Sequence, residues 1–158
     1  MKIKFWLYRN YWLTLPIFVV VVLVLALLRF PVDVKILTAV LGGLLSFVYF
    51  VQKQRLEETK LFRDIFQECN KRYDCLNGKL NKILRVEDAK ELSESERNTL
   101  DDYFNLCSEE YLYFKQGYIY PDVWKAWENG MKTVFFSPRV KEYWQSERES
   151  DSYYSLPL

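Results

Sequence analysis

The sequence predicts an all-α protein, with an N-terminal two-helix transmembrane hairpin followed by a small helical cytoplasmic domain. Two observations carry this prediction. Two long apolar runs near the N-terminus contain no charged residue, and the remainder shows apolar residues at helical spacing without alternating strands of useful length. We expect the hairpin over residues 1–52 and the cytoplasmic domain over residues 53–158.

The two expected membrane spans cover residues 11–28 and 36–51. Neither contains a charge, and in the second only Thr38 and Ser46 are polar. A helix rises about 1.5 Å per residue, so each run with its flanking aromatic residues approaches the roughly 30 Å of a bilayer core. The stretch 29–35 between them leaves room only for a turn. A buried hairpin in a soluble protein is the alternative.

Basic residues favour one orientation of this hairpin, because Lys and Arg accumulate on the cytoplasmic side of a membrane. Five of them lie near the outer ends of the spans and two lie in the turn, so both chain ends are expected in the cytoplasm. The outer residues are Lys2, Lys4, Arg9, Lys53 and Arg55, and those of the turn are Arg29 and Lys35.

Small residues in the second span suggest close helix packing. Ala39 and Gly43, and likewise Gly42 and Ser46, are four residues apart, and such pairs let helix backbones approach in lipid. They predict either association of subunits or packing against the first span.

The second helix is expected to continue beyond Val51 into the cytoplasm. An apolar stripe at helical spacing supports this, and it is either a coiled-coil seam or the core of the domain. Asn77-Gly78 is expected to bend or end the helix. The stripe consists of Phe62, Phe66, Cys69, Tyr73, Leu76, Leu80 and Ile83.

Three further helices follow an acidic loop at 86–97. Ser93 and Glu96 form a capping-box pattern for a helix from Glu94 to about Gln116, with Gly117 as its stop. Pro121 and Ser137-Pro138 begin the next two. The aromatic C-terminal tail is expected to dock back onto the domain.

The residue types argue against catalysis. The chain has no histidine, which removes the commonest general base and zinc ligand. We therefore expect no enzyme activity, catalytic residue, metal site or cofactor. Adjacent carboxylates such as Glu109 and Glu110 are interpreted as a solvated or salt-bridged face. Three cysteines without paired spacing do not suggest disulfides.

Charge is segregated within the expected domain. Stretches 71–85 and 115–141 are basic, and 87–110 between them is acidic. Basic stretches that meet in the fold would bind phosphates, with aromatic rings stacking on bases. Two other arrangements are possible for the charges: the acidic stretch pairs with the basic stretches, or the basic stretches face lipid headgroups. The alternative for Trp124 is that it is a core residue. The predicted phosphate contacts are Arg72, Lys79, Lys82, Lys132 and Arg139, with Tyr73 and Trp124 as stacking surfaces.

Two stretches, 66–77 and 103–127, resemble a group of small, mostly uncharacterised bacterial proteins. The layout of a two-span hairpin before a compact cytoplasmic domain is similar to the small membrane effectors of type III CRISPR systems. This second resemblance implies an antiviral defence effector in the bacterial inner membrane, a homo-oligomer (dimer or tetramer) that binds cyclic oligoadenylate and then disrupts or depolarises the membrane. The rival hypothesis is a non-enzymatic accessory membrane protein whose helical domain docks a protein partner.

Overall fold

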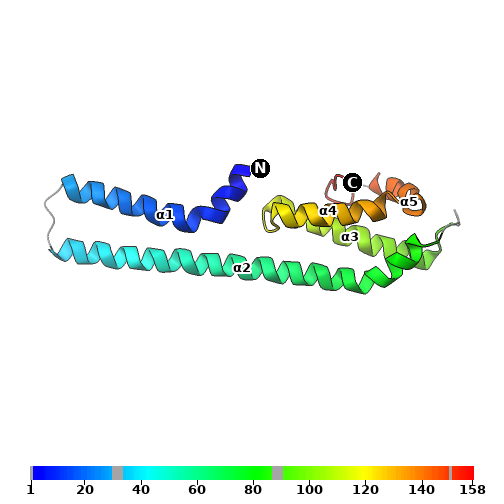
Figure 1. The fold of residues 1–158 in the computed structure, drawn as a ribbon, viewed down its shortest axis with the longest axis horizontal. Helices are drawn as coiled ribbons and strands as arrows, with labels where there is room; N and C mark the ends of the chain where they lie inside the picture. The colour runs from blue at the N-terminus through cyan, green and yellow to red at the C-terminus, as the bar shows by residue number, and fades with distance from the viewer. Residues whose placement is uncertain (1, 30–33, 87–90, 150) are drawn as a thin grey trace. The chain divides into compact units, whose positions relative to one another are not determined.

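The structure, a computed structural model, describes residues 2–29, 34–86, 91–149 and 151–158, without the side chains of 2–9, 11, 26, 27, 34 and 37. The prediction of an all-α fold is confirmed, because these ranges hold five helices and no strand (Figure 1). The helices are α1 (Lys2–Arg29), α2 (Val34–Leu84), α3 (Glu94–Gln116), α4 (Pro121–Phe135) and α5 (Pro138–Arg148).

The chain divides into two compact units, Met1–Leu61 and Phe62–Leu158, and α2 contributes to both. The division lies further along α2 than the expected domain boundary between residues 52 and 53. We call the second unit the helical head. As predicted, α2 continues past Val51, and it also runs through Asn77-Gly78 to Leu84 without interruption. Of the two predicted alternatives, a bend or an end of the helix at this pair, the end is therefore wrong.

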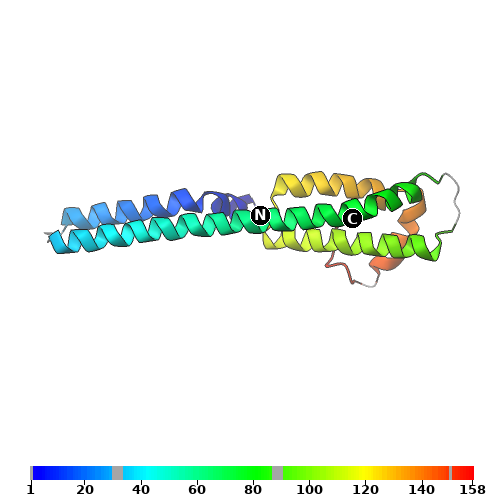
Figure 2. The same ribbon diagram turned by 90° about the horizontal axis from the view of Figure 1, so that it is seen from below.

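In the first unit, α1 and the beginning of α2 lie side by side and antiparallel (Figures 1 and 2). The Arg55 guanidinium lies 4.0 Å from the centroid of the Trp12 ring. Large apolar side chains are exposed on both helices, for example Phe18 at 66%, Leu28 at 79% and Leu45 at 73%. Within the part of the chain that was described, no helix is both long enough and apolar enough for a membrane crossing.

The first helix is longer than the predicted span and starts at Lys2, so that Pro16 lies in its interior. Proline removes one backbone hydrogen bond and clashes with the carbonyl four residues earlier. Figure 1 shows the N-terminal turns of α1 bent away from the rest of the helix, as this clash would produce. The turn residues 30–33 and the side chains of 2–9 lie outside the described residues.

The apolar stripe of α2 contributes to the core of the helical head. Cys69, Leu80 and Ile83 are buried. The ring centroid of Phe62 lies 4.4 Å from that of Tyr120, and Phe66 stacks on Trp127 at 5.6 Å. The stripe therefore packs on residues of the same chain, and the core alternative is confirmed.

Local signals set the ends of α3 as predicted. The Ser93 hydroxyl accepts a hydrogen bond from the Glu96 backbone N–H, and the Glu96 carboxylate accepts one from the Ser93 backbone N–H at 2.8 Å. At the other end Gly117 adopts a left-handed conformation, φ 89°, and its N–H donates to the Phe114 carbonyl. Such a φ is costly for any residue with a Cβ.

The starts of α4 and α5 are also confirmed, with proline in the first turn of each. Ser137 precedes α5, but its hydroxyl makes no capping hydrogen bond. The tail docks back as expected: Tyr153, Leu156 and Leu158 are buried, and the Trp144 indole N–H donates to the Leu158 carbonyl oxygen at 3.0 Å.

Replacing Gly117 with Ala should destabilise the chain by about 1 kcal/mol, because the left-handed conformation brings Cβ too close to the following carbonyl oxygen. Gly78→Ala is the matched control. Gly78 lies inside α2, nothing lies within 4 Å of an added Cβ, and alanine should stabilise the helix by about 0.5–1 kcal/mol. Thermal unfolding followed by circular dichroism should therefore shift in opposite directions. A shift in the same direction for both variants would contradict this account of the cap.

Candidate functional site

Three of the predicted phosphate-binding cations have carboxylate partners. Both terminal nitrogens of Arg72 donate to the Glu109 carboxylate. Arg139 donates to both Glu96 oxygens, at 2.8 and 3.0 Å, and to the Ile83 carbonyl oxygen at 3.2 Å. The Lys132 ammonium lies 2.9 Å from Glu128. These contacts correspond to the alternative in which acidic and basic stretches pair, although Glu128 is itself part of a basic stretch.

The other four predicted residues have different surroundings. Trp124 is buried and stacks on Phe114 with a centroid distance of 5.1 Å, so it is a core residue. Tyr73 is 37% exposed, and Lys79 and Lys82 are exposed on α2. Of the seven residues, Tyr73 alone lines the cavity that the described parts of α2, α3 and α4 form. Their role as ligand contacts stays a prediction.

A groove beside Arg72 is no better suited to phosphate. It is lined by two cations, Lys71 and Arg72, and by three carboxylates. An excess of negative charge repels an anionic ligand. The carboxylates are those of Glu68, Asp102 and Glu109.

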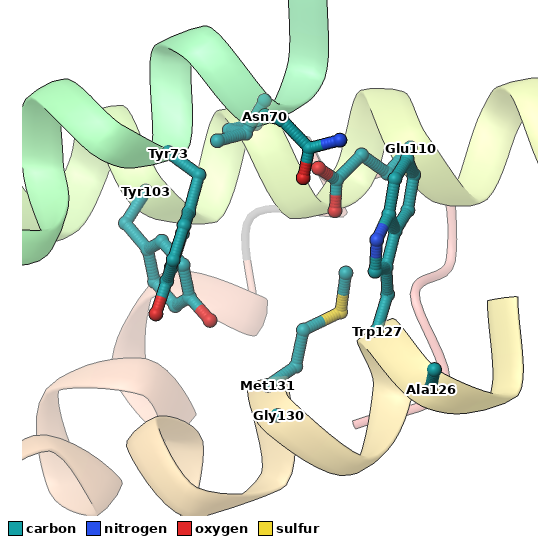
Figure 3. Close-up of a pocket in the computed structure, with 9 residues that line it drawn as sticks. Asn70, Tyr73, Tyr103, Glu110, Ala126, Trp127, Gly130 and Met131 are labelled. Atoms are coloured by element: carbon teal, nitrogen blue, oxygen red, sulfur yellow. The ribbon is translucent and has the colours of Figure 1, made fainter. Parts of the chain in front are cut away.

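The most distinctive site is a cavity of about 210 Å³ between α2, α3 and α4 (Figure 3). We call it the Glu110 cavity. Glu110 is the only charged residue that lines it, and the other walls are aromatic, apolar or neutral polar. The principal side chains are those of Asn70, Tyr73, Tyr103, Glu110, Trp127 and Met131.

The helical repeat of α3 explains why a carboxylate is buried here. Glu110 follows Tyr103 by seven residues and Leu106 by four, so it shares their buried face. It is only 6% exposed, and its carboxylate points into the cavity. No hydrogen bond or ion pair joins it to another residue that the structure describes. The interpretation of Glu110 as a solvated or salt-bridged residue is therefore wrong, whereas Glu109 is salt-bridged as expected.

Burial controls the ionisation of this region. Desolvation raises the pKa of Glu110 to about 8, with a smaller opposing effect from Arg72 and a small further increase from Glu109. Desolvation likewise raises the pKa of Cys69 to about 12 and that of Cys107 well above its ordinary value. All three cysteines are unpaired thiols, in agreement with the sequence analysis.

The arrangement combines one buried acidic group with aromatic walls and a thioether. A carboxyl group with a strongly perturbed pKa in a cavity is a candidate functional group. The sequence contained a signal for it, since Glu110 interrupts an otherwise apolar face between Leu106 and Phe114. Among the described residues, no three His, Cys, Asp or Glu side chains form a group able to hold a metal ion.

The raised pKa of Glu110 makes the stability of the chain depend on pH. Between about pH 4.5 and 8 the unfolded chain has lost the Glu110 proton while the folded chain retains it. Stability should therefore fall as pH rises through this window, by up to about 1.4 kcal/mol per pH unit, and level off above it. Glu110→Gln should remove this slope and raise the melting temperature at pH 8.

The control for this measurement is Glu128→Gln, which removes the same charge from a partly exposed position on α4. Melting temperatures of the two variants and the parent chain are compared from pH 5 to pH 9. Parallel pH profiles for the parent and Glu110→Gln would show that Glu110 ionises with an ordinary pKa.

Comparison of the chain with known protein families, curated proteins and solved structures finds no match. The two resemblances drawn from the sequence therefore stay predictions.

Proposed function

We propose that the chain is a membrane-anchored binding protein. The hairpin of α1 and the beginning of α2 fixes it in a bacterial inner membrane, with both chain ends in the cytoplasm. The helical head binds a ligand and acts without catalysis. The observation that carries this proposal is the pair of charge-free apolar runs over 11–28 and 36–51.

The exposure of the first unit supports the anchor. Ile17, Phe18 and Leu25 on α1 and Leu45 and Phe50 on α2 are all more than half exposed. Contiguous apolar surface of this kind is rare on soluble monomers and marks a surface that another apolar phase covers. Both apolar runs are continuous in the amino-acid sequence. The side chains of 11, 26, 27 and 37, which belong to these runs, lie outside the described residues.

The residue content of the head supports binding rather than chemistry. The chain has no histidine, and the Arg72–Glu109 and Arg139–Glu96 pairs engage groups that would otherwise serve as acids, bases or anion contacts. The Glu110 cavity offers a site for a small ligand.

Membrane anchoring is tested by fractionation of cells that express the full chain. The chain should remain with the membranes after washing with alkaline carbonate and should dissolve in detergent. Leu45→Asp should reduce the retained fraction, because a carboxylate near the centre of a span costs roughly 2.5–3.5 kcal/mol.

Leu56→Asp is the matched control. Leu56 is also an exposed leucine of α2, but it lies beyond the second run, so its replacement should leave retention unchanged. If the parent chain stayed in the soluble fraction without detergent, the anchor would be ruled out.

The effector hypothesis, in which the ligand is cyclic oligoadenylate and the outcome is membrane disruption, is the second candidate. It is favoured by the exposed position of Tyr73, Lys79 and Lys82 on α2, where cations and an aromatic ring are accessible to a nucleotide. It also requires Arg72 and Arg139 to exchange their carboxylate partners for phosphates.

Thermal melts of the full chain with cyclic tri-, tetra- and hexa-adenylate test this candidate. A ligand at about 100 times its dissociation constant should stabilise the chain by about 2.7 kcal/mol. The double variant Lys79→Glu, Lys82→Glu should abolish the shift, whereas Lys125→Glu on α4 should preserve it. Unchanged melting with all three rings would leave the docking of another partner as the function of the head.

A further inference from the structure

We infer that the Glu110 cavity binds a small organic ammonium ion, with the Glu110 carboxylate as the counter-charge and aromatic rings as the walls. The inference rests on the proposed binding role of the head. It does not depend on membrane anchoring, because every residue involved belongs to the helical head.

The first step is the missing counter-charge. Glu110 is 94% buried, points into the cavity and has no ion pair among the described residues. Arg72, the cation that interacts electrostatically with Glu110, directs both terminal nitrogens to Glu109 and does not line the cavity. A buried carboxyl group without a partner stays protonated, and a cation that enters the cavity would stabilise its ionised form.

Asn70, which also lines the cavity, carries a further hydrogen-bond acceptor, its side-chain amide oxygen. The side-chain N–H of Asn70 donates to the Phe66 carbonyl oxygen at 2.8 Å, which fixes the orientation of the amide. Asn70 and Glu110 both line the cavity, and Figure 3 shows the Asn70 amide and the Glu110 carboxylate in the same part of the view. The Asn70 amide oxygen and the ionised Glu110 carboxylate are both acceptors, which suit a ligand that carries N–H groups or positive charge.

The third step is the nature of the walls. The rings of Tyr73 and Tyr103 lie on one side of the cavity and the indole of Trp127 lies on the opposite side, with Met131 below (Figure 3). Phe66 stacks on Trp127 and holds the indole in place. Aromatic faces attract alkylammonium groups, most strongly where water is excluded. Tyr73 is partly exposed, which gives the ligand a route of entry.

The chemistry of the lining also selects the kind of cation. Hard metal ions bind through several oxygen ligands, and Glu110 is the only carboxylate in this cavity. A single carboxylate among aromatic rings instead matches an ammonium group on a short alkyl chain. The volume of about 210 Å³ limits the ligand to a small one.

The test is calorimetric titration of the purified full chain with choline, n-butylammonium and glycerophosphocholine. Choline and n-butylammonium represent free quaternary and primary ammonium ions, and glycerophosphocholine represents a lipid headgroup. The detergent is a maltoside, because phosphocholine detergents carry a competing ammonium group. Saturable one-to-one binding of any of the three supports the inference, and the tightest ligand identifies the source of the ammonium group.

The neutral isostere of choline, 3,3-dimethyl-1-butanol, separates charge recognition from apolar burial without any mutation. It should bind at least about ten-fold more weakly than choline, because it cannot pair with the carboxylate. Equal affinities for the two compounds, or no binding of any ammonium ion, would overturn the inference.

Glu110→Gln should weaken ammonium binding by at least about ten-fold, and the control Glu128→Gln should leave it unchanged.

Binding should also strengthen from pH 6 to pH 9 and release a proton at neutral pH, since the ligand favours the carboxylate. Arg72, Cys69, Glu109, Cys107 and Tyr103 interact electrostatically with Glu110. Tyr73 of α2 and Trp127 and Met131 of α4 line the same cavity. Proton release appears as an enthalpy that differs between phosphate and Tris buffers. An ammonium ion that binds with no such difference would contradict pairing with Glu110.

The outcome is separable from that of the fractionation experiment. Ammonium binding by a chain that is not retained in membranes would reject the anchor alone. Membrane retention without ammonium binding would reject the ligand alone.

Discussion

The packing of Phe104 is the contact on which the helical head depends. Its side chain is completely buried, and its ring contacts later segments of the chain. The centroid distances are 5.0 Å to Phe135 of α4, 4.8 Å to Trp144 of α5 and 6.1 Å to Tyr153 of the tail. Aromatic pairs at these distances contribute about 0.5–1.5 kcal/mol each beyond the area that they bury. Because one α3 side chain joins three elements, α3 is enclosed by the rest of the head.

The enclosure of α3 determines what its acidic residues do. Glu96 binds Arg139 and the Ser93 N–H, Asp101 accepts a hydrogen bond from the Tyr143 hydroxyl at 2.7 Å, and Glu109 binds Arg72. Several carboxylates of the acidic stretch therefore bind side chains of neighbouring elements and link those elements to α3. Glu110 differs because its position on the helix faces a cavity instead of a basic or hydroxyl side chain. Its burial without a hydrogen bond or ion pair among the described residues raises its pKa.

The elements of the head could be predicted because their ends depend on local chemistry. A capping box, a glycine stop and a proline start each act within a few residues. The extension of α1 on the N-terminal side of Pro16 could not be predicted in this way. A proline is compatible both with the start of a helix and with a kink inside one.

The candidate site was harder to predict, because it depends on contacts between distant residues. The sequence shows that charge is segregated, but only the packing of α5 against α3 shows that Arg139 pairs with Glu96, 43 residues away. In the same way, Glu109 and Glu110 are neighbours in sequence, and only the packing around α3 shows which is salt-bridged and which is buried. The most direct measurement is the titration of the Glu110 carboxyl carbon by NMR in the full chain, labelled at glutamate and assigned with Glu110→Gln. The account predicts a pKa near 8 in the absence of ligand. A pKa in the ordinary range of an exposed glutamate would contradict it.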